Sequence, residues 1–135
     1  MNVIVREPIS PSTGPESRSR PSLKLVTAII RPERLGEVSE ALGRLELVGG
    51  FTVSDVRGNG RSSTTTRCYR GIPYVIRLAC ELKIEVVVPE DRVNEVMESI
   101  QQSARTGSVG DGKIWVTNVA TVVRIRTGER GLAAL

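Results

Sequence analysis

The chain has 135 residues, of which 39% are hydrophobic and 25% charged, and its formal net charge is +4. This length favours one domain, and no run approaches the ~20 consecutive apolar residues of a membrane-spanning helix. The chain contains no histidine, which excludes Ser-His catalytic triads and most transition-metal sites. The first ten residues lack the basic-then-apolar layout of a secretory signal, so we expect a cytoplasmic protein.

The first 22 residues are rich in proline and serine, and such a segment buries too little apolar surface to offset its ordering entropy. We therefore predict a flexible tail over residues 1–22 and a folded domain over residues 23–135. The apolar, β-branched run at 23–30 predicts a buried strand. Pro32 suits the first position of a helix, in which apolar residues recur at helical spacing before Val-Gly-Gly at 48–50 ends it.

Two strands, a second helix and a last strand follow. Residues 51–58 and 83–89 predict strands, and apolar residues at i, i+3, i+4 and i+7 from Val93 predict a helix. The last strand is predicted from Ile114 to about Ile125. The order β-α-β-β-α-β is typical of the ferredoxin-like α+β fold, in which two helices cover one face of an antiparallel sheet. Because so short a chain leaves the other face open, we expect self-association through it.

The segment between the second and third predicted strands, about residues 59–81, is too long for a hairpin turn and has no sustained apolar period. Such a segment inside a compact domain is usually functional or disordered. We predict a protruding mobile loop without regular structure that orders on meeting a ligand or a partner. Its two cysteines, Cys68 and Cys80, are expected to be free thiols, and a redox-sensitive disulfide between them is the less favoured alternative.

A glycine-rich stretch at residues 106–113 contains Gly-x-x-x-x-Gly-Lys, which is most of the consensus sequence of a phosphate-binding P-loop. Ile114 follows where a P-loop needs Ser or Thr for magnesium, and a strand follows where it needs a helix. The glycines still favour a turn whose backbone N–H groups converge on an anion, with a positive charge added by Lys113. A tight connector is the alternative. The glycines of this stretch are Gly107, Gly110 and Gly112.

Arg124 and Arg126 alternate with apolar residues in the last predicted strand, so both guanidinium groups are expected on one face of it. Two adjacent guanidinium groups suit a polyphosphate, and a solvated strand face is the alternative. A strand of about a dozen residues would hold them too far from the glycine stretch for one triphosphate to reach both. The two ends are therefore expected to meet across neighbouring subunits. Glu85 could accept a hydrogen bond from an adenine amino group or a ribose hydroxyl, or face solvent.

Several of these stretches together resemble the P-II signal-transduction proteins. Residues 69–74, Tyr-Arg-Gly-Ile-Pro-Tyr, are similar to the tip of their long T-loop, and residues 58–61, Gly-Asn-Gly-Arg, to its base. Residues 106–113 are similar to their B-loop and residues 123–130 to their C-loop. The resemblance runs from Leu23 to about Leu135, and it places the T-loop at about residues 59–81.

The resemblance implies a ferredoxin-like homotrimer that is a regulator and not an enzyme. It also implies ATP, ADP or AMP in the clefts between subunits. A change in the shape of the T-loop would control a transporter, including a membrane transporter, or an enzyme. The residues matched to the nucleotide site are Thr52, Gly60, Arg61, Glu85, Val87, Gly110, Asp111, Gly112, Lys113, Arg124 and Arg126.

Three departures from the family pattern argue against the magnesium and 2-oxoglutarate that most members bind. Ser62 replaces a glutamine, and Asn59 replaces a phenylalanine. Glu81 replaces a lysine that pairs with the 2-oxoglutarate carboxylate, and an acidic group there would repel a dicarboxylate. The pattern resembles instead a branch that accompanies carboxysomes and inorganic-carbon systems. The alternative effector is then bicarbonate, held at Gly60, Arg61 and Ser62.

Tyr74 matches the tyrosine that many proteobacterial members uridylylate, but the departures at Ile72 and Pro73 favour an unmodified side chain. Two other functional classes are weaker. A small nucleotide-hydrolysing enzyme lacks a Ser or Thr after Lys113, a following helix and a clear acidic pair for a metal. A nucleic-acid-binding sheet would need exposed aromatic residues for stacking, and aromatic residues make up only 3% of the chain.

Overall fold

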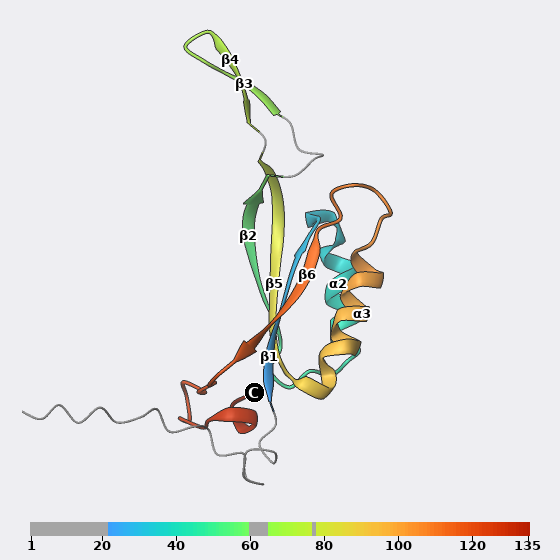
Figure 1. The fold of residues 1–135 in the computed structure, drawn as a ribbon, viewed down its shortest axis with the longest axis vertical. Helices are drawn as coiled ribbons and strands as arrows, with labels where there is room; N and C mark the ends of the chain where they lie inside the picture. Colours follow the sequence, from blue (N-terminus) through green and yellow to red (C-terminus); the bar gives the residue numbers. More distant parts are fainter. Residues whose placement is uncertain (1–21, 60–64, 77) are drawn as a thin grey trace, which may run out of the picture.

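The computed structural model of the protein describes residues 22–59, 65–76 and 78–135, and Figure 1 shows their arrangement. The strands and helices are β1 (Leu23–Ile30), α2 (Leu35–Gly43), β2 (Thr52–Gly58), β3 (Thr65–Tyr69), β4 (Ile72–Ile76), β5 (Ala79–Pro89), α3 (Val93–Ala104) and β6 (Lys113–Val119). Short 3₁₀ turns occupy Pro32–Arg34, Glu90–Arg92 and Gly131–Ala134. Apart from Ser22, the predicted tail lies outside the described residues.

The main sheet has the strand order β2-β5-β1-β6, and each neighbouring pair is antiparallel. Both helices lie on one side of this sheet (Figure 1). The predicted ferredoxin-like α+β fold is thereby confirmed. None of the helices in the described part of the chain has the length and apolar character needed to cross a membrane.

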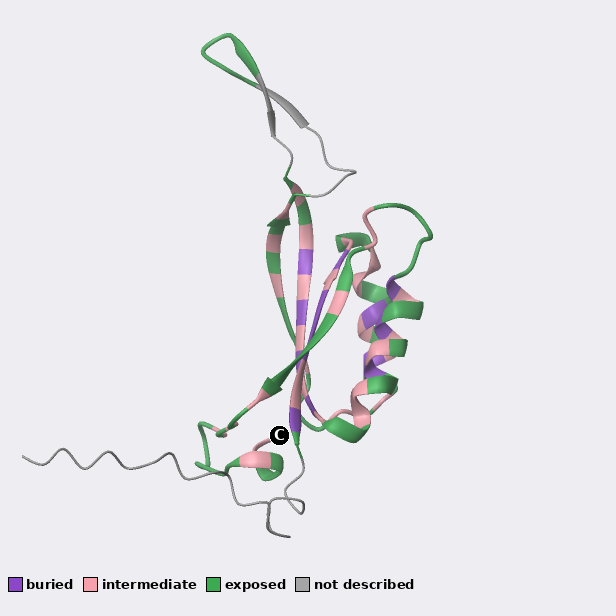
Figure 2. Ribbon diagram, in the orientation of Figure 1, coloured by how far each residue is buried: buried purple, intermediate pink, exposed green. Residues whose placement is uncertain are grey.

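The hydrophobic core lies between the two helices and the sheet face that they cover, and Figure 2 shows the buried residues gathered there. Alternate residues of β1 and β5 point into it because successive side chains of a strand leave opposite faces. The helices add residues spaced four apart, which share one helical face. The buried core residues are Val26, Ala28, Ile30, Val38, Leu42, Leu82, Ile84, Val86, Val88, Val96, Ile100 and Ala104.

Several predicted boundaries were wrong, among them the start of the third predicted strand, which is Ala79 and not Lys83. Helix α2 ends at Gly43 and not at the Val-Gly-Gly stretch, because Glu46 has φ 52° and the chain turns there. The last strand ends at Val119 and not near Ile125. Its pairing partner β1 begins at Leu23, opposite Val119, so within the described residues no strand lies beside the chain beyond Val119.

The long loop contains regular structure that the sequence analysis did not predict. Strands β3 and β4 form an antiparallel hairpin that projects beyond one end of the main sheet (Figure 1). Tyr69 pairs with Ile72, so Arg70 and Gly71 alone make the turn. Both have positive φ, 52° and 77°, as a type I′ hairpin turn requires. The signal was missed because arginine is an unusual residue for that conformation.

The sheet face opposite the helices carries a mixed set of side chains. Thr52, Glu85, Thr27 and Trp115 pair in register across the four strands and form one row on it. Thr27 in the middle is only 4% exposed, whereas Trp115 on the edge strand is 44% exposed.

Candidate functional site

The sheet topology brings two of the predicted functional segments to the same end of the molecule. Strands β1 and β2 end there, and β5 and β6 begin there. The glycine loop, residues 105–112 between α3 and β6, therefore lies at the same end as the base of the projecting hairpin (Figure 1). The C-terminal segment after Val119 lies at the opposite end.

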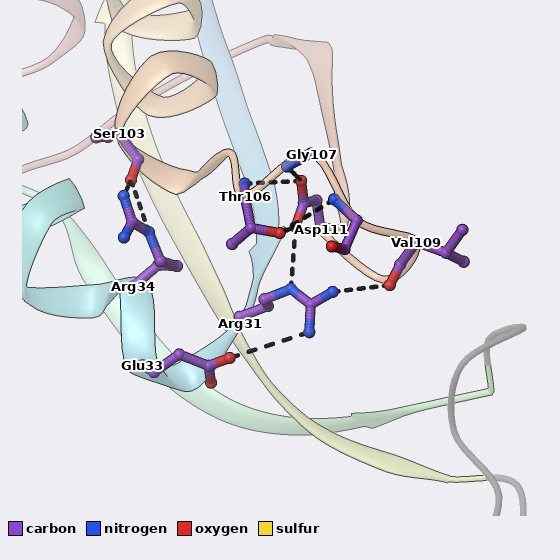
Figure 3. A network of polar contacts seen from close by, with 9 residues as sticks. Arg31, Glu33, Arg34, Ser103, Thr106, Gly107, Val109 and Asp111 are labelled. Carbon is purple, nitrogen blue, oxygen red and sulfur yellow. Dashed lines mark hydrogen bonds and ion pairs between the residues drawn. The ribbon is translucent and has the colours of Figure 1, made fainter.

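The glycine loop is closed around its own aspartate. Gly107, Gly110 and Gly112 have φ between 89° and 102°, a region that favours glycine. The carboxylate of Asp111 accepts hydrogen bonds from the backbone N–H groups of Thr106 (2.8 Å) and Gly107 (2.9 Å), and also from the Thr106 hydroxyl (Figure 3). At the start of the loop these backbone N–H groups converge on Asp111, an anion of the loop itself, and the predicted binding of a ligand phosphate stays a prediction.

Arg31 ties the loop to the end of β1. Its Nε donates to Asp111 Oδ1 at 3.0 Å, and its Nη2 donates to the backbone carbonyl of Val109 at 2.7 Å (Figure 3). Glu33 Oε1 lies 4.0 Å from Nη1 of the same guanidinium group. Arg31 was not among the predicted site residues, because 80 residues separate it from Asp111 and no local pattern joins the two.

These contacts act on the ionisation of Asp111. The hydrogen bonds from the Thr106 hydroxyl and backbone, together with the Arg31 guanidinium, hold the pKa of this carboxyl far below its ordinary value. Asp111 is therefore ionised throughout the neutral range. Its negative charge is paired with Arg31 at the end of β1, and its side chain is only 24% exposed.

Gly112 marks the closest approach of the loop to the sheet. A Cβ atom at this position would lie 1.7 Å from the carbonyl oxygen of Ile29 in β1. Only glycine allows this contact without a shift of the backbone. One residue later, Lys113 begins β6, is exposed, and pairs in register with Ile29.

The residues predicted for the adenosine lie together on the open sheet face. Thr52 and Glu85 are register partners on β2 and β5, and Val87 lies two residues further along β5, beyond the end of the β2 ladder. Glu85 is partly exposed and its Oε1 lies 3.6 Å from the amino group of Lys83. Its carboxylate thus points along the sheet surface beside a cation.

The two C-terminal arginines do not share a strand face, which corrects the sequence-based prediction. Residues 125–127 form a turn that is closed by the pairing of Val123 with Arg130. Arg124 donates to Glu129 Oε1 (3.1 Å) and to the carbonyl oxygen of Leu135 (2.6 Å), whereas Arg126 is exposed. Gly128, with φ 74°, supplies the left-handed backbone conformation that follows this turn.

Several predicted residues cannot be placed. Gly60, Arg61 and Ser62, the proposed effector-anion residues, lie outside the described part of the chain, as does the side chain of Tyr74. Cys68 and Cys80 are both free and exposed, one in the hairpin and the other in the main sheet.

Comparison with known proteins identifies the family. The sequence model of the nitrogen regulatory protein P-II family matches residues 23–129. The chain belongs to the P-II family. The nitrogen regulatory protein P-II of Rhizobium meliloti (strain 1021) is 46% identical over 113 residues, which span 84% of this chain and all of that protein. P-II 2 of Methanothermobacter thermautotrophicus is 50% identical, over 84% of this chain and 97% of its own length.

The fold comparison agrees with the sequence comparison. The crystal structure of Arabidopsis thaliana PII bound to citrate matches with a TM-score of 0.69 and 41% sequence identity, over 85% of this chain and 94% of that one. The assignment of residues 106–113 to the B-loop and of residues 59–81 to the T-loop stays a prediction, and the β3–β4 hairpin lies inside the second of these ranges.

The close approach of Gly112 makes a specific stability prediction. Gly112→Ala should destabilise the protein more than Gly107→Ala in urea-induced unfolding. Both changes place a side chain at positive φ, at about 1–2 kcal/mol each. Only Gly112→Ala also drives a Cβ atom into the Ile29 carbonyl, since no atom lies within 4 Å of a Cβ atom built at Gly107. Equal losses for the two variants would show that the loop can move away from β1 freely.

The lowered pKa of Asp111 predicts how the stability of the protein changes at low pH. Because its folded-state pKa lies below the ordinary value, the ionised carboxylate contributes stability that is complete above about pH 4 and is lost as the pH falls further. The stability difference between the wild type and Asp111→Asn should therefore be constant near neutrality and shrink in acid. Urea unfolding at a series of pH values measures it, and a difference that does not change in acid would contradict the prediction.

Proposed function

We propose that this P-II protein binds adenine nucleotides in the clefts of a homotrimer and regulates a partner protein through its T-loop. Each cleft would combine the glycine loop of one subunit with Arg124 and Arg126 of the next. One observation carries the proposal: the two sets of cationic and N–H groups lie beyond opposite ends of β6 (Figure 1). That strand alone has seven residues, or ~20 Å, so one phosphate chain reaches both sets only across a subunit boundary.

The glycine loop would supply the phosphate contacts. Asp111 and the Thr106 hydroxyl already accept the N–H groups of Thr106, Gly107 and Ser108. We propose that a phosphate meets the N–H groups on the other side of Asp111, from Gly110 to Lys113, where the exposed ammonium group of Lys113 adds a positive charge. Because Asp111 is held as an ion-paired acceptor, it is a poor candidate for a general base. The proposal is therefore binding without hydrolysis.

The open sheet face would receive the adenosine. Glu85 can accept a hydrogen bond from an adenine amino group or a ribose hydroxyl, and Thr52 beside it has a hydroxyl that can both donate and accept. The backbone of Val87 lies past the end of the β2 ladder and can pair with the edge of the base. These groups support a preference for adenine over a base without an exocyclic amino group at that position.

Exposed apolar side chains support the trimer. Ile125 is fully exposed in the isolated chain, and Val123 and Leu132 are 45% and 50% exposed. All three belong to the C-terminal segment that carries Arg124. A surface of this kind is typically covered by another subunit, and a neighbour that buried it would also receive the arginine side chains.

The hairpin tip is the surface that we propose for the partner. Tyr69 and Ile72 are 64% and 69% exposed, and the Arg70 guanidinium group lies 5.5 Å from the centre of the Tyr69 ring. A cation stacked on an exposed aromatic ring beside an aliphatic side chain is typical of an interface anchor. The partner would be a transporter, including one in a membrane, or an enzyme in the cytoplasm.

The charge of the Glu81 carboxylate limits which second effector the protein can bind. It lies against the base of the T-loop, where a Cβ atom added to Gly58 would be 2.2 Å from its Oε2. A negative charge at this place disfavours 2-oxoglutarate, which carries two carboxylates, more than it disfavours a small monoanion. We therefore propose bicarbonate, together with ADP or AMP, as the alternative signal that the protein responds to.

A mixing experiment tests the shared cleft. By calorimetry, the wild type should bind ATP, ADP or AMP, whereas Lys113→Gln and the double variant Arg124→Gln/Arg126→Gln should each bind much more weakly. Trimers formed by co-refolding the two variants in equal amounts should recover about a quarter of the sites, because each mixed ring then has one intact cleft. Failure of the mixture to bind more than its parents would refute a site shared between subunits, and a wild type that binds no adenylate would refute the function.

A separate titration tests the effector. Calorimetry of ADP binding should show tighter binding with bicarbonate present and no change with 2-oxoglutarate. Glu81→Lys should introduce a response to 2-oxoglutarate, because it replaces the repelling charge with an attracting one. Enhancement by 2-oxoglutarate alone in the wild type would defeat the bicarbonate proposal without affecting the nucleotide site.

A further inference from the structure

Packing against α3 does not by itself explain the position of the glycine loop. A cavity of about 410 Å³ lies between the end of α3, the end of β1 and the loop itself. Its walls include Ala104 and Arg105 from the α3 end, Ile30 from β1, and Gly112 from the loop. Because there is open space beneath the loop, its position must depend on the points where it is attached to the rest of the chain.

Polar contacts from one residue make two of those attachments. Arg31 binds the Asp111 carboxylate and the Val109 carbonyl, which lie two residues apart in the loop. Its backbone directly follows β1, whose central position in the sheet makes it a rigid support. The side chain is 26% exposed and that of Asp111 24%, so the pair is partly shielded from water. Such an ion pair is screened less than one on the open surface.

The ion pair between Arg31 and Asp111 also compensates the negative charge of the Asp111 carboxylate. Asp111 lies between Gly110 and Gly112, whose N–H groups are proposed to bind phosphate. An unpaired carboxylate at this position would repel a phosphate chain at short range. Arg31 compensates that charge, while its guanidinium group, already engaged by Asp111, Val109 and Glu33, is not offered to the ligand.

We infer that Arg31 is the positioning residue of the nucleotide site: it holds the glycine loop against β1 and neutralises Asp111, so that the loop N–H groups face a phosphate. The inference rests on the proposed function for its effect on nucleotide binding. Its structural part, the fastening of the loop, is independent of any ligand.

The chain offers a matched control in Arg34, three residues further on. Arg34 also joins two distant segments, because its Nε and Nη2 both donate to the Ser103 carbonyl at 3.0 and 2.6 Å (Figure 3). Its side chain is 27% exposed, nearly the same as that of Arg31. It fastens the end of α3 and not the glycine loop, so it separates general stabilisation from positioning.

The test compares Arg31→Met, Arg34→Met and Arg31→Met/Asp111→Asn as full-length proteins. Calorimetry with ATP should show about tenfold weaker binding for Arg31→Met, because an unpaired carboxylate then faces the phosphates. AMP, with one phosphate, should lose less. Arg34→Met should bind ATP as the wild type does, and the double variant should bind more tightly than Arg31→Met because the repelling charge is gone.

Hydrogen exchange of the nucleotide-free proteins completes the test. Arg31→Met should speed amide exchange over residues 106–112, whereas Arg34→Met should not. Unchanged exchange in the loop, or ATP binding by Arg31→Met as tight as by Arg34→Met, would overturn the inference while leaving the proposed function standing. A wild type that binds no adenylate would instead refute the proposed function, and the exchange measurement alone would then decide whether Arg31 fastens the loop.

Discussion

The antiparallel pairing of β1 with both β5 and β6 is the constraint on which the rest of the structure depends. β1 is a central strand, and its alternate side chains reach the core between the sheet and the helices. The same register sets Lys113 beside Ile29 and places Arg31 where the glycine loop passes the end of β1. A slip of one residue would exchange the two faces of the strand and expose the core residues.

The glycine loop orients its backbone N–H groups without the helix that follows a P-loop. In a P-loop, the amino end of the following helix orients N–H groups and adds a partial positive charge. Here a strand follows the loop, so no helix dipole is available. The carboxylate of Asp111 gathers the first N–H groups instead, and Arg31 balances its charge. The loop is thus shaped by an internal anion in the absence of any ligand, and such preorganisation would lower the entropy lost on the phosphate binding that we propose.

The proposed function follows from where the binding groups lie relative to one another. One chain carries the glycine loop at one end of β6 and the arginines of the C-terminal segment beyond the other end. In the proposed trimer, one nucleotide would therefore contact both segments only across a subunit boundary. Within one chain, the base of the projecting hairpin lies at the same end as the glycine loop. A nucleotide bound in the proposed cleft would then lie next to the segment that we propose to contact a partner protein.

Local patterns in the sequence were sufficient for the order of the main-sheet strands and the two helices, the ferredoxin-like fold, the apolar faces of the helices and the family. These features depend on side-chain periodicity and short motifs, such as the apolar face of α3, that are independent of distant residues. The assembled chain alone decided where β6 ends, because a strand lasts only as long as its partner, and it placed Arg124 in a turn. The β3–β4 hairpin requires a positive φ at Arg70, and an arginine in a sequence does not indicate that conformation. The role of Arg31 emerged last, because its partner Asp111 is 80 residues away and only the packing of β1 beside β6 brings the two together.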